Sequence, residues 1–373
     1  MSVGTTSSLS FRCAEWTREQ GVNPIGSALV CDTFVLVETP PPWPRDVSDI
    51  PAFAEVMRSR PHRVRLLAVL PAGDSAGDLP AGDSAGDPPE NPTGRTPGGS
   101  PDSPTGKAAG IPAAEPVWTT AAAGRNRRSG VRVTVWRRRN SNDFQGTDHV
   151  VSQDRLAEGI LRLLDLDLDP GLDLDPGRGP DSGEGAQARP APAEILLCGH
   201  GRRDRCCGRV GTRLHLDVAS AWPGVRVRRC SHTGGHRFAP TGFTFPDGRA
   251  WGFLDVPTLD RIVRRGGRPG ELRGRYRGNT ALDQWGQVAE RELFERFGWG
   301  WLDHELTSSH TEVADSGRLA TVELAWQGPT GAATATASVE VVRDVPVLVC
   351  GEAPDLAEKT SPELALRSIT IRR

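Results

Sequence analysis

The feature that most constrains this chain's fold is an apolar strand that runs directly into cysteine. Residues 194–198 (EILLC) are apolar enough for a buried strand, and the loop GHGRRDRC follows at once. A helix is expected from about 208 to 221, then a strand at 225–230, a strand pair around the turn at 246–248 and a helix from about 258 to 265. The pattern predicts an α/β fold, with Cys198 at the end of its first strand.

Two cysteines and two histidines in this region are candidate metal ligands. Cys198 and Cys207 are separated by eight residues, and His232 and His236 by three. Cys207 lies at the expected start of a helix, where the free N–H groups and the helix dipole stabilise a thiolate. The paired glycines between the histidines allow a close backbone approach to whatever the histidines bind.

The spacing bears on the kind of metal but leaves alternatives open. Structural zinc commonly uses two cysteines only two to four residues apart, whereas the loop here is wider. A 2Fe-2S cluster suits a wide loop, and two histidines replace two cysteines in Rieske centres. Rieske sequences, however, place one cysteine and one histidine in each of two loops. In this chain both cysteines come first and both histidines follow.

At these residues the chain resembles the sucrase/ferredoxin-like family, whose thioredoxin-like ferredoxin domain carries C-x8-C, H-x3-H and a GGHRFA signature. The resemblance implies that Cys198, Cys207, His232 and His236 ligate a 2Fe-2S cluster in the bis-histidinyl, non-Rieske manner. It is strong over residues 195–254 and weaker over ETPPPWP and the helix containing GQVAE, so it touches about two thirds of the chain. One departure is Gly199, where members often have threonine.

Glycine and proline divide the rest of the chain. Gly 43 and Pro 31 together make about one residue in five, more than a packed domain usually carries. The predicted organisation is an N-terminal α/β region at 1–164 with a disordered insert at 71–116, then an acidic Gly/Pro-rich linker at 165–192. The thioredoxin-like domain follows at 193–267, and a C-terminal helix with β-strands occupies 268–373. The helix is expected from 281 to 297 with Thr280 as its N-cap, and strands at 321–326, 338–343 and 345–350.

The remaining cysteines carry weaker signals. Cys13, Cys31 and Cys350 are expected to be single inert thiols, and Cys230 a buried strand residue. Cys206, the first of a Cys-Cys pair, is not implied as a ligand. In the same loop, His200 is a candidate hydrogen-bond donor to the site and Asp204 a candidate partner for Arg202 or a loop N–H.

The arginines at 125–139 alternate with valines as on an exposed sheet face, so no nucleic-acid site is expected.

These observations favour an electron-transfer protein, a redox carrier more than a catalyst, with a donor or acceptor protein as its partner. Histidine ligation predicts a potential that depends on pH. The alternatives are a binding module stabilised by zinc at the same four residues, and a thiol enzyme that uses Cys206 or Cys207 as its nucleophile. With a net charge of -2, no long apolar segment and no secretion signal, the chain is expected in the cytoplasm and away from membranes.

Overall fold

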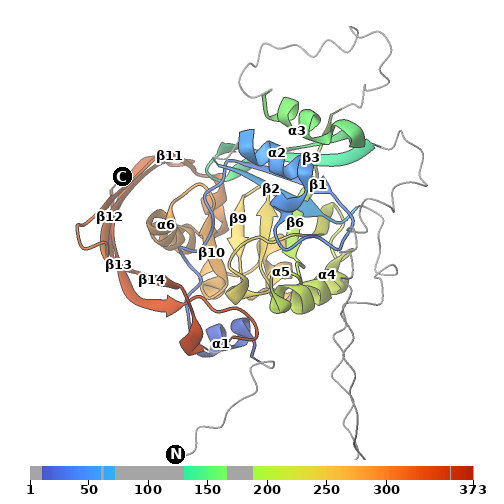
Figure 1. Ribbon diagram of the computed structural model, residues 1–373. Coiled ribbons are helices and arrows are strands. Elements are labelled where there is room, and N and C mark those ends of the chain that lie inside the picture. The colour runs from blue at the N-terminus through green and yellow to red at the C-terminus, as the bar shows by residue number, and fades with distance from the viewer. Residues whose placement is uncertain (1–10, 60–62, 72–129, 166–187, 353, 373) are drawn as a thin grey trace, which may run out of the picture. The chain divides into compact units, whose positions relative to one another are not determined.

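The computed structural model describes residues 11–59, 63–71, 130–165, 188–352 and 354–372 (Figure 1). These residues form a mixed α/β structure with one ten-stranded sheet and one four-stranded sheet. The α/β fold class predicted from the sequence is confirmed. The predicted disordered insert and most of the predicted acidic linker lie outside the described residues.

Four strands and two helices build the first half of the large sheet. They are β1 (Thr33–Glu38), α2 (Pro51–Ser59), β2 (Val64–Val69), β3 (Gly130–Asn140), β4 (Asp143–Ser152) and α3 (Leu156–Asp165). β1 and β2 are parallel, with α2 between them in the chain, and β3 pairs antiparallel with both β1 and β4. Alternating valines on these strands pack against Phe53 of α2 and Ile160 of α3, so this half has an apolar core of its own.

The second half repeats this arrangement. Its elements are β6 (Ala193–Cys198), a π-helical segment (Cys207–Gly211), α4 (Thr212–Val218), β7 (Val225–Cys230), β8 (Gly242–Phe245), β9 (Arg249–Trp251) and α5 (Val256–Val263). β6 and β7 are parallel, β8 is antiparallel to β6, and β9 is antiparallel to β8. This strand order agrees with the thioredoxin-like sheet expected for this region, and the first half has the same order.

The two halves meet edge to edge in one sheet. β2 runs antiparallel to β7, with Val69 opposite Cys230, and β10 (Tyr276–Asn279) and β5 (Arg189–Pro190) form the outer edges. β5 lies inside the predicted linker and pairs with β4. The boundaries predicted at 164, 192 and 267 stay a prediction, but the sheet itself is continuous across all three.

The helix α6 (Gln284–Phe297) begins three residues later than the sequence indicates. Its N-cap is Asp283, whose carboxylate accepts the N–H groups of Trp285 and Gly286, and not Thr280. The Thr280 hydroxyl instead donates to the carbonyl of Gly248, so it is occupied by the neighbouring strand connection. The helix ends as predicted at Gly298, whose φ of 67° suits glycine.

The C-terminal strands form an antiparallel meander against α6 (Figure 1). They are β11 (Glu305–Val313), β12 (Leu319–Gly328), β13 (Gly331–Pro346) and β14 (Thr360–Arg372). The strands predicted at 338–343 and 345–350 prove to be one strand, β13, which ends at Pro346. β11 and β14 were not predicted: β11 is mostly exposed and β14 buries only one residue completely, so neither has a clear alternation of buried and exposed positions. Inward residues of β12 and β13 share one core with α6.

Candidate metal centre

Two of the four predicted ligands meet where β6 ends. Cys198 is the last residue of β6 and Cys207 is the first of the π-helical segment; both are fully buried, and their side chains hydrogen-bond each other. A Cβ built on Gly211 would lie 1.9 Å from the carbonyl oxygen of Cys198. Any larger residue would push this helical turn off the strand, so Gly211 allows Cys207 to reach Cys198.

The two histidines lie on the turn that follows β7. Gly234 and Gly235 have φ angles of 82° and 65°, which bend the chain so that the two imidazole rings lie 5.9 Å apart. The His232 side chain also hydrogen-bonds Cys198. Its Nδ1 atom is buried without a hydrogen-bond partner, while Nδ1 of His236 lies 3.2 Å from Oδ2 of Asp204. The bond to Cys198 is therefore made by Nε2 of His232, the ring nitrogen that faces the cysteine pair.

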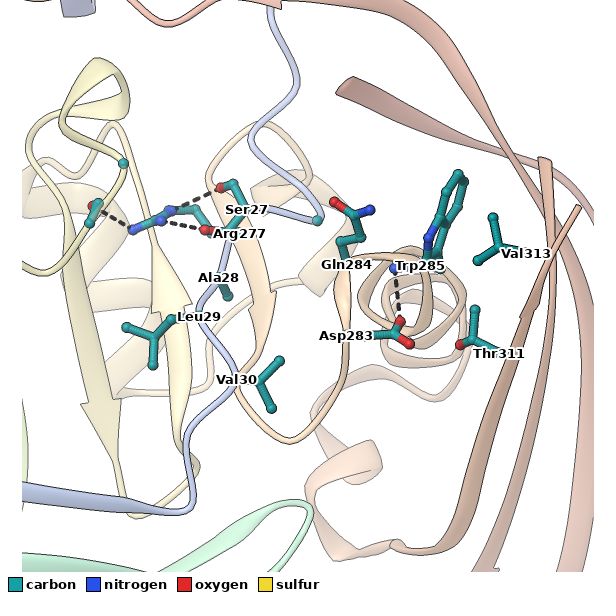
Figure 2. Close-up of a pocket in the computed structure, with 13 residues that line it drawn as sticks. Ser27, Ala28, Leu29, Val30, Arg277, Asp283, Gln284, Trp285, Thr311 and Val313 are labelled. Atoms are coloured by element: carbon teal, nitrogen blue, oxygen red, sulfur yellow. Dashed lines mark hydrogen bonds between the residues drawn. The ribbon is translucent and has the colours of Figure 1, made fainter. Parts of the chain in front are cut away.

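Two arginines hold this turn, of which Arg277 is buried and Arg65 is half-buried. Arg65 donates from Nη2 to the carbonyl of His232 at 2.5 Å, and Arg277 donates from Nη1 to the carbonyl of Gly234 at 3.0 Å. Arg277 also binds Ser27 through both its hydroxyl and its carbonyl, as the dashed lines in Figure 2 show. Burial lowers the pKa of Arg65 and lowers that of Arg277 to about 10. Both guanidiniums stay charged at neutral pH, so the site carries positive charge in its surroundings.

The two cysteine thiols titrate differently. The hydrogen bond from Cys207, joined by that from His232, holds the pKa of Cys198 well below its ordinary range despite complete burial. The same bond, together with burial, raises the pKa of the Cys207 thiol well above its ordinary range.

A pocket of about 630 Å³ opens beside the glycine turn (Figure 2). One part of the pocket wall is formed by Gly234, Gly235 and Arg277. The segment from Gly26 to Val30 forms another part, and Trp285 lines the pocket from the first turn of α6. The histidine turn therefore borders a space that a small molecule or a partner's side chain could enter.

The ETPPPWP segment after β1 reaches the cysteine loop. His200 is buried, its Nε2 lies 2.9 Å from the carbonyl oxygen of Pro44, and its ring packs edge-on against Trp43 at 5.9 Å between centroids. Through this contact, a segment of the first half of the sheet supports the cysteine loop of the second half. At Gly199, a Cβ would lie 2.3 Å from Cδ of Arg229, so in this chain an arginine side chain fills the space next to glycine.

The structure also assembles a second cluster that sequence reasoning missed. Sγ of Cys13, Cys206 and Cys350 and the carboxylate of Asp204 lie within 4.8 Å of one another, and this set could bind a metal ion. Cys13 and Cys350, expected as single thiols, lie instead against the ligand loop. The adjacent pair Cys206-Cys207 was the one signal in the sequence that could have indicated this second cluster. Two successive residues at the start of a helix point in different directions, so each can belong to a different site.

Comparisons with known proteins identify the family. The family model for sucrase/ferredoxin-like proteins matches residues 24–278, so the chain belongs to the sucrase/ferredoxin-like family. The match covers both halves of the large sheet, including all four predicted ligands. No curated protein and no solved structure matches the chain. Within the described ranges, no helix is both long enough and apolar enough to cross a membrane.

Proposed function

We propose that this chain is an electron-transfer protein whose 2Fe-2S cluster is bound by Cys198, Cys207, His232 and His236. The observation that carries the proposal is the pairing of donors on two facing loops: a buried cysteine pair at the end of β6 and a histidine pair after β7. The family membership supports the same reading.

The arrangement of the donors favours two irons over one zinc. Four donors around a single zinc would gather within about 4 Å of one another. The His236 ring turns its Nδ1 toward Asp204, away from the other three residues. None of the four residues belongs to the set of donors that does gather within 4.8 Å. Four donors that do not converge on one point suit two irons better than one zinc ion.

When bound, the cluster accepts and releases one electron. The protein's own part is to place the two ends of the site in different surroundings. The cysteine end is fully buried, whereas the His236 side chain is 17% exposed, so the histidine end is the shorter route for an electron to a docked partner. Arg65 and Arg277 supply positive charge behind the histidine turn, which favours the reduced and more negative form.

The thiol-enzyme alternative is disfavoured by the state of Cys207. Its side chain is fully buried, and the hydrogen bond to Cys198 together with burial raises its pKa well above the ordinary range. A buried neutral thiol is a poor nucleophile. Cys206 is buried too and lies against Cys350 and Cys13, away from solvent.

The test is the visible spectrum of the full chain purified without oxygen, before and after dithionite, with iron and acid-labile sulfide measured on the same sample. We expect a red-brown protein with about two irons and two sulfides per chain, bleached on reduction. Cys207→Ser and His232→Ala should lose the colour, while Cys31→Ser, which removes a buried thiol elsewhere, should keep it. A colourless chain after cluster reconstitution, with zinc lost in His232→Ala, would establish a zinc-stabilised binding module instead.

A further inference from the structure

The cluster of Cys13, Cys206, Cys350 and Asp204 joins three distant parts of the chain. Cys13 begins α1 (Cys13–Glu19) near the N-terminus, Asp204 and Cys206 belong to the ligand loop, and Cys350 follows β13 near the C-terminus. The three other side chains are each at most 4% exposed, and Cys350 is half-buried. Ala14, Ala239 and Leu348 pack around the thiols, so their surroundings are largely apolar.

The distances within the cluster are short enough for one metal ion to reach all four residues. The three Sγ–Sγ distances are 3.1 Å for Cys206–Cys350, 3.5 Å for Cys13–Cys350 and 3.9 Å for Cys13–Cys206. Oδ2 of Asp204 lies 3.4 Å from Sγ of Cys13, and Oδ1 lies 3.6 Å from Sγ of Cys350. Zinc with bonds of about 2.3 Å to sulfur and about 2.0 Å to oxygen sets such edges at about 3.8 and 3.5 Å.

Other occupants fit less well. A 4Fe-4S cluster binds each cysteine to a separate iron, which spreads the sulfurs farther apart than a single ion does. A disulfide between Cys206 and Cys350 would use two of the thiols, and it would leave Cys13 and the carboxylate with no role. Three thiolates and one carboxylate in tetrahedral array suit zinc, a borderline-soft cation without geometric preferences of its own.

We propose that Cys13, Cys206, Cys350 and Asp204 form a mononuclear zinc site, separate from the four residues proposed to hold the iron-sulfur cluster. Zinc binding releases the three thiol protons to solvent and gives three Zn–S bonds and one Zn–O bond. The ion fastens the N-terminal helix and the C-terminal segment to the loop that carries Cys207. The site has a structural role, since four protein ligands leave no open position for a substrate.

The surroundings can balance the charge of such a site. Zinc with three thiolates and a carboxylate has a net charge of -2. The Arg237 guanidinium lies close enough to Cys13 to interact with it electrostatically, it is 7% exposed, and its Nε has no hydrogen-bond partner. Glu363 also interacts electrostatically with Arg237, and the anionic zinc site would add a second negative charge beside this buried guanidinium.

Metal analysis of the full-length protein, grown with zinc and iron, tests this proposal. We expect about one zinc per chain in the wild type and in the variant Cys198→Ser/Cys207→Ser, which lacks two proposed cluster ligands. The zinc content per chain should be at least tenfold lower in Cys13→Ser and Cys350→Ser than in the wild type. Cys31→Ser should retain the wild-type zinc content. Iron and sulfide measured on the same samples separate the two proposals. Iron without zinc overturns only the zinc proposal. Zinc without iron overturns the electron-transfer proposal, and the zinc proposal then stands only if Cys13→Ser and Cys350→Ser lose the zinc and Cys198→Ser/Cys207→Ser retains it.

X-ray absorption at the zinc edge of the wild-type protein decides the matter even if the cysteine variants fail to fold. We expect three sulfur ligands at about 2.3 Å and one oxygen. Two sulfurs and two nitrogens would place the zinc at the cysteine-histidine site and overturn the proposal. Protein that contains no zinc would also overturn the proposal. This holds if Cys206 and Cys350 form a disulfide during anaerobic purification, and equally if all three thiols react freely with an alkylating agent.

Discussion

Nδ1 of His236 lies 3.2 Å from Oδ2 of Asp204, and Oδ1 of the same carboxylate accepts the backbone N–H of Cys206 at 2.8 Å. Asp204 therefore lies between the histidine turn and the cysteine loop. A carboxylate that accepts a hydrogen bond from a metal-binding imidazole orients the ring and increases its electron donation. The residue also belongs to the proposed zinc site, so it connects the two candidate centres.

Asp204→Asn is expected to raise the midpoint potential of the cluster. The substitution removes a buried negative charge beside His236 and weakens electron donation from its ring, and both changes favour the reduced form. Anaerobic dye-linked titration measures the shift, with the exposed Asp217→Asn as the control. Cys350→Ser separates the effect from loss of zinc, since it removes a proposed zinc ligand that has no contact with His236. A potential that is unchanged or lower in Asp204→Asn would contradict the expectation.

Gly235→Ala is expected to destabilise the histidine turn and to reduce the iron content. The φ of Gly235 is 65°, and an added Cβ would lie 2.5 Å from Nη2 of Arg277. Backbone strain and displacement of the arginine should together lower the free energy of unfolding by about 2–3 kcal/mol. Gly317→Ala is the matched control, because its φ is 66° and nothing lies within 4 Å of the added Cβ. It should cost about 1 kcal/mol and leave the iron content unchanged. Urea unfolding and iron analysis check both variants, and equal losses would show that the Arg277 contact is unimportant.

Glu290→Gln is expected to lower the free energy of unfolding by about 3–5 kcal/mol. Glu290 on α6 is fully buried, pairs with Arg249 of β9 at 2.7 Å, and accepts hydrogen bonds from Tyr276 and Trp301. The variant leaves the Arg249 charge buried without its counter-ion. The control is Glu158→Gln, which breaks an exposed pair with Arg162 and should cost at most about 0.5 kcal/mol. Chemical unfolding at pH 7 measures both, and a loss below 1 kcal/mol in Glu290→Gln would contradict the prediction.

His215 is expected to make the protein less stable as the solution is acidified. Burial in α4, and secondarily the charge of Arg229, lower its pKa below the ordinary value of 6.5. The unfolded chain therefore binds a proton at His215 more readily than the folded chain does. The contribution of neutral His215 to the free energy of unfolding is complete above pH 6.5, and it is lost as the pH falls through that value toward the folded-state pKa. Unfolding free energies at pH 7.5 and 5.5 should differ less in His215→Gln than in the wild type. His310→Gln, which changes an exposed histidine, should show the same difference in unfolding free energy between the two pH values as the wild type. If His215→Gln also shows the full wild-type difference, the prediction is wrong.

The local elements and the candidate ligands of the larger site could be predicted from the amino-acid sequence. Strand periodicity located β6 and β7, the Pro246-Asp247-Gly248 turn located β8 and β9, and Gly298 ended α6 at the predicted residue. These features depend on residues close together in the chain, whose preferences are readable without knowing the fold. The arginine run was harder to interpret: Arg138 was expected on a solvated face, but it is 12% exposed and binds Asp32 and Thr280.

Which distant residues meet could not be predicted in this way, because it depends on long-range packing. Cys13 and Cys350 are 337 positions apart, yet their sulfur atoms lie 3.5 Å from each other because α1 and the end of β13 both pack on the ligand loop. The edge pairing of β2 with β7, which makes one sheet of two similar halves, likewise depends on long-range contacts. A cysteine in isolation has the same local signal whether it is an inert buried thiol or one of four ligands, and chain folding alone brings the other three to it.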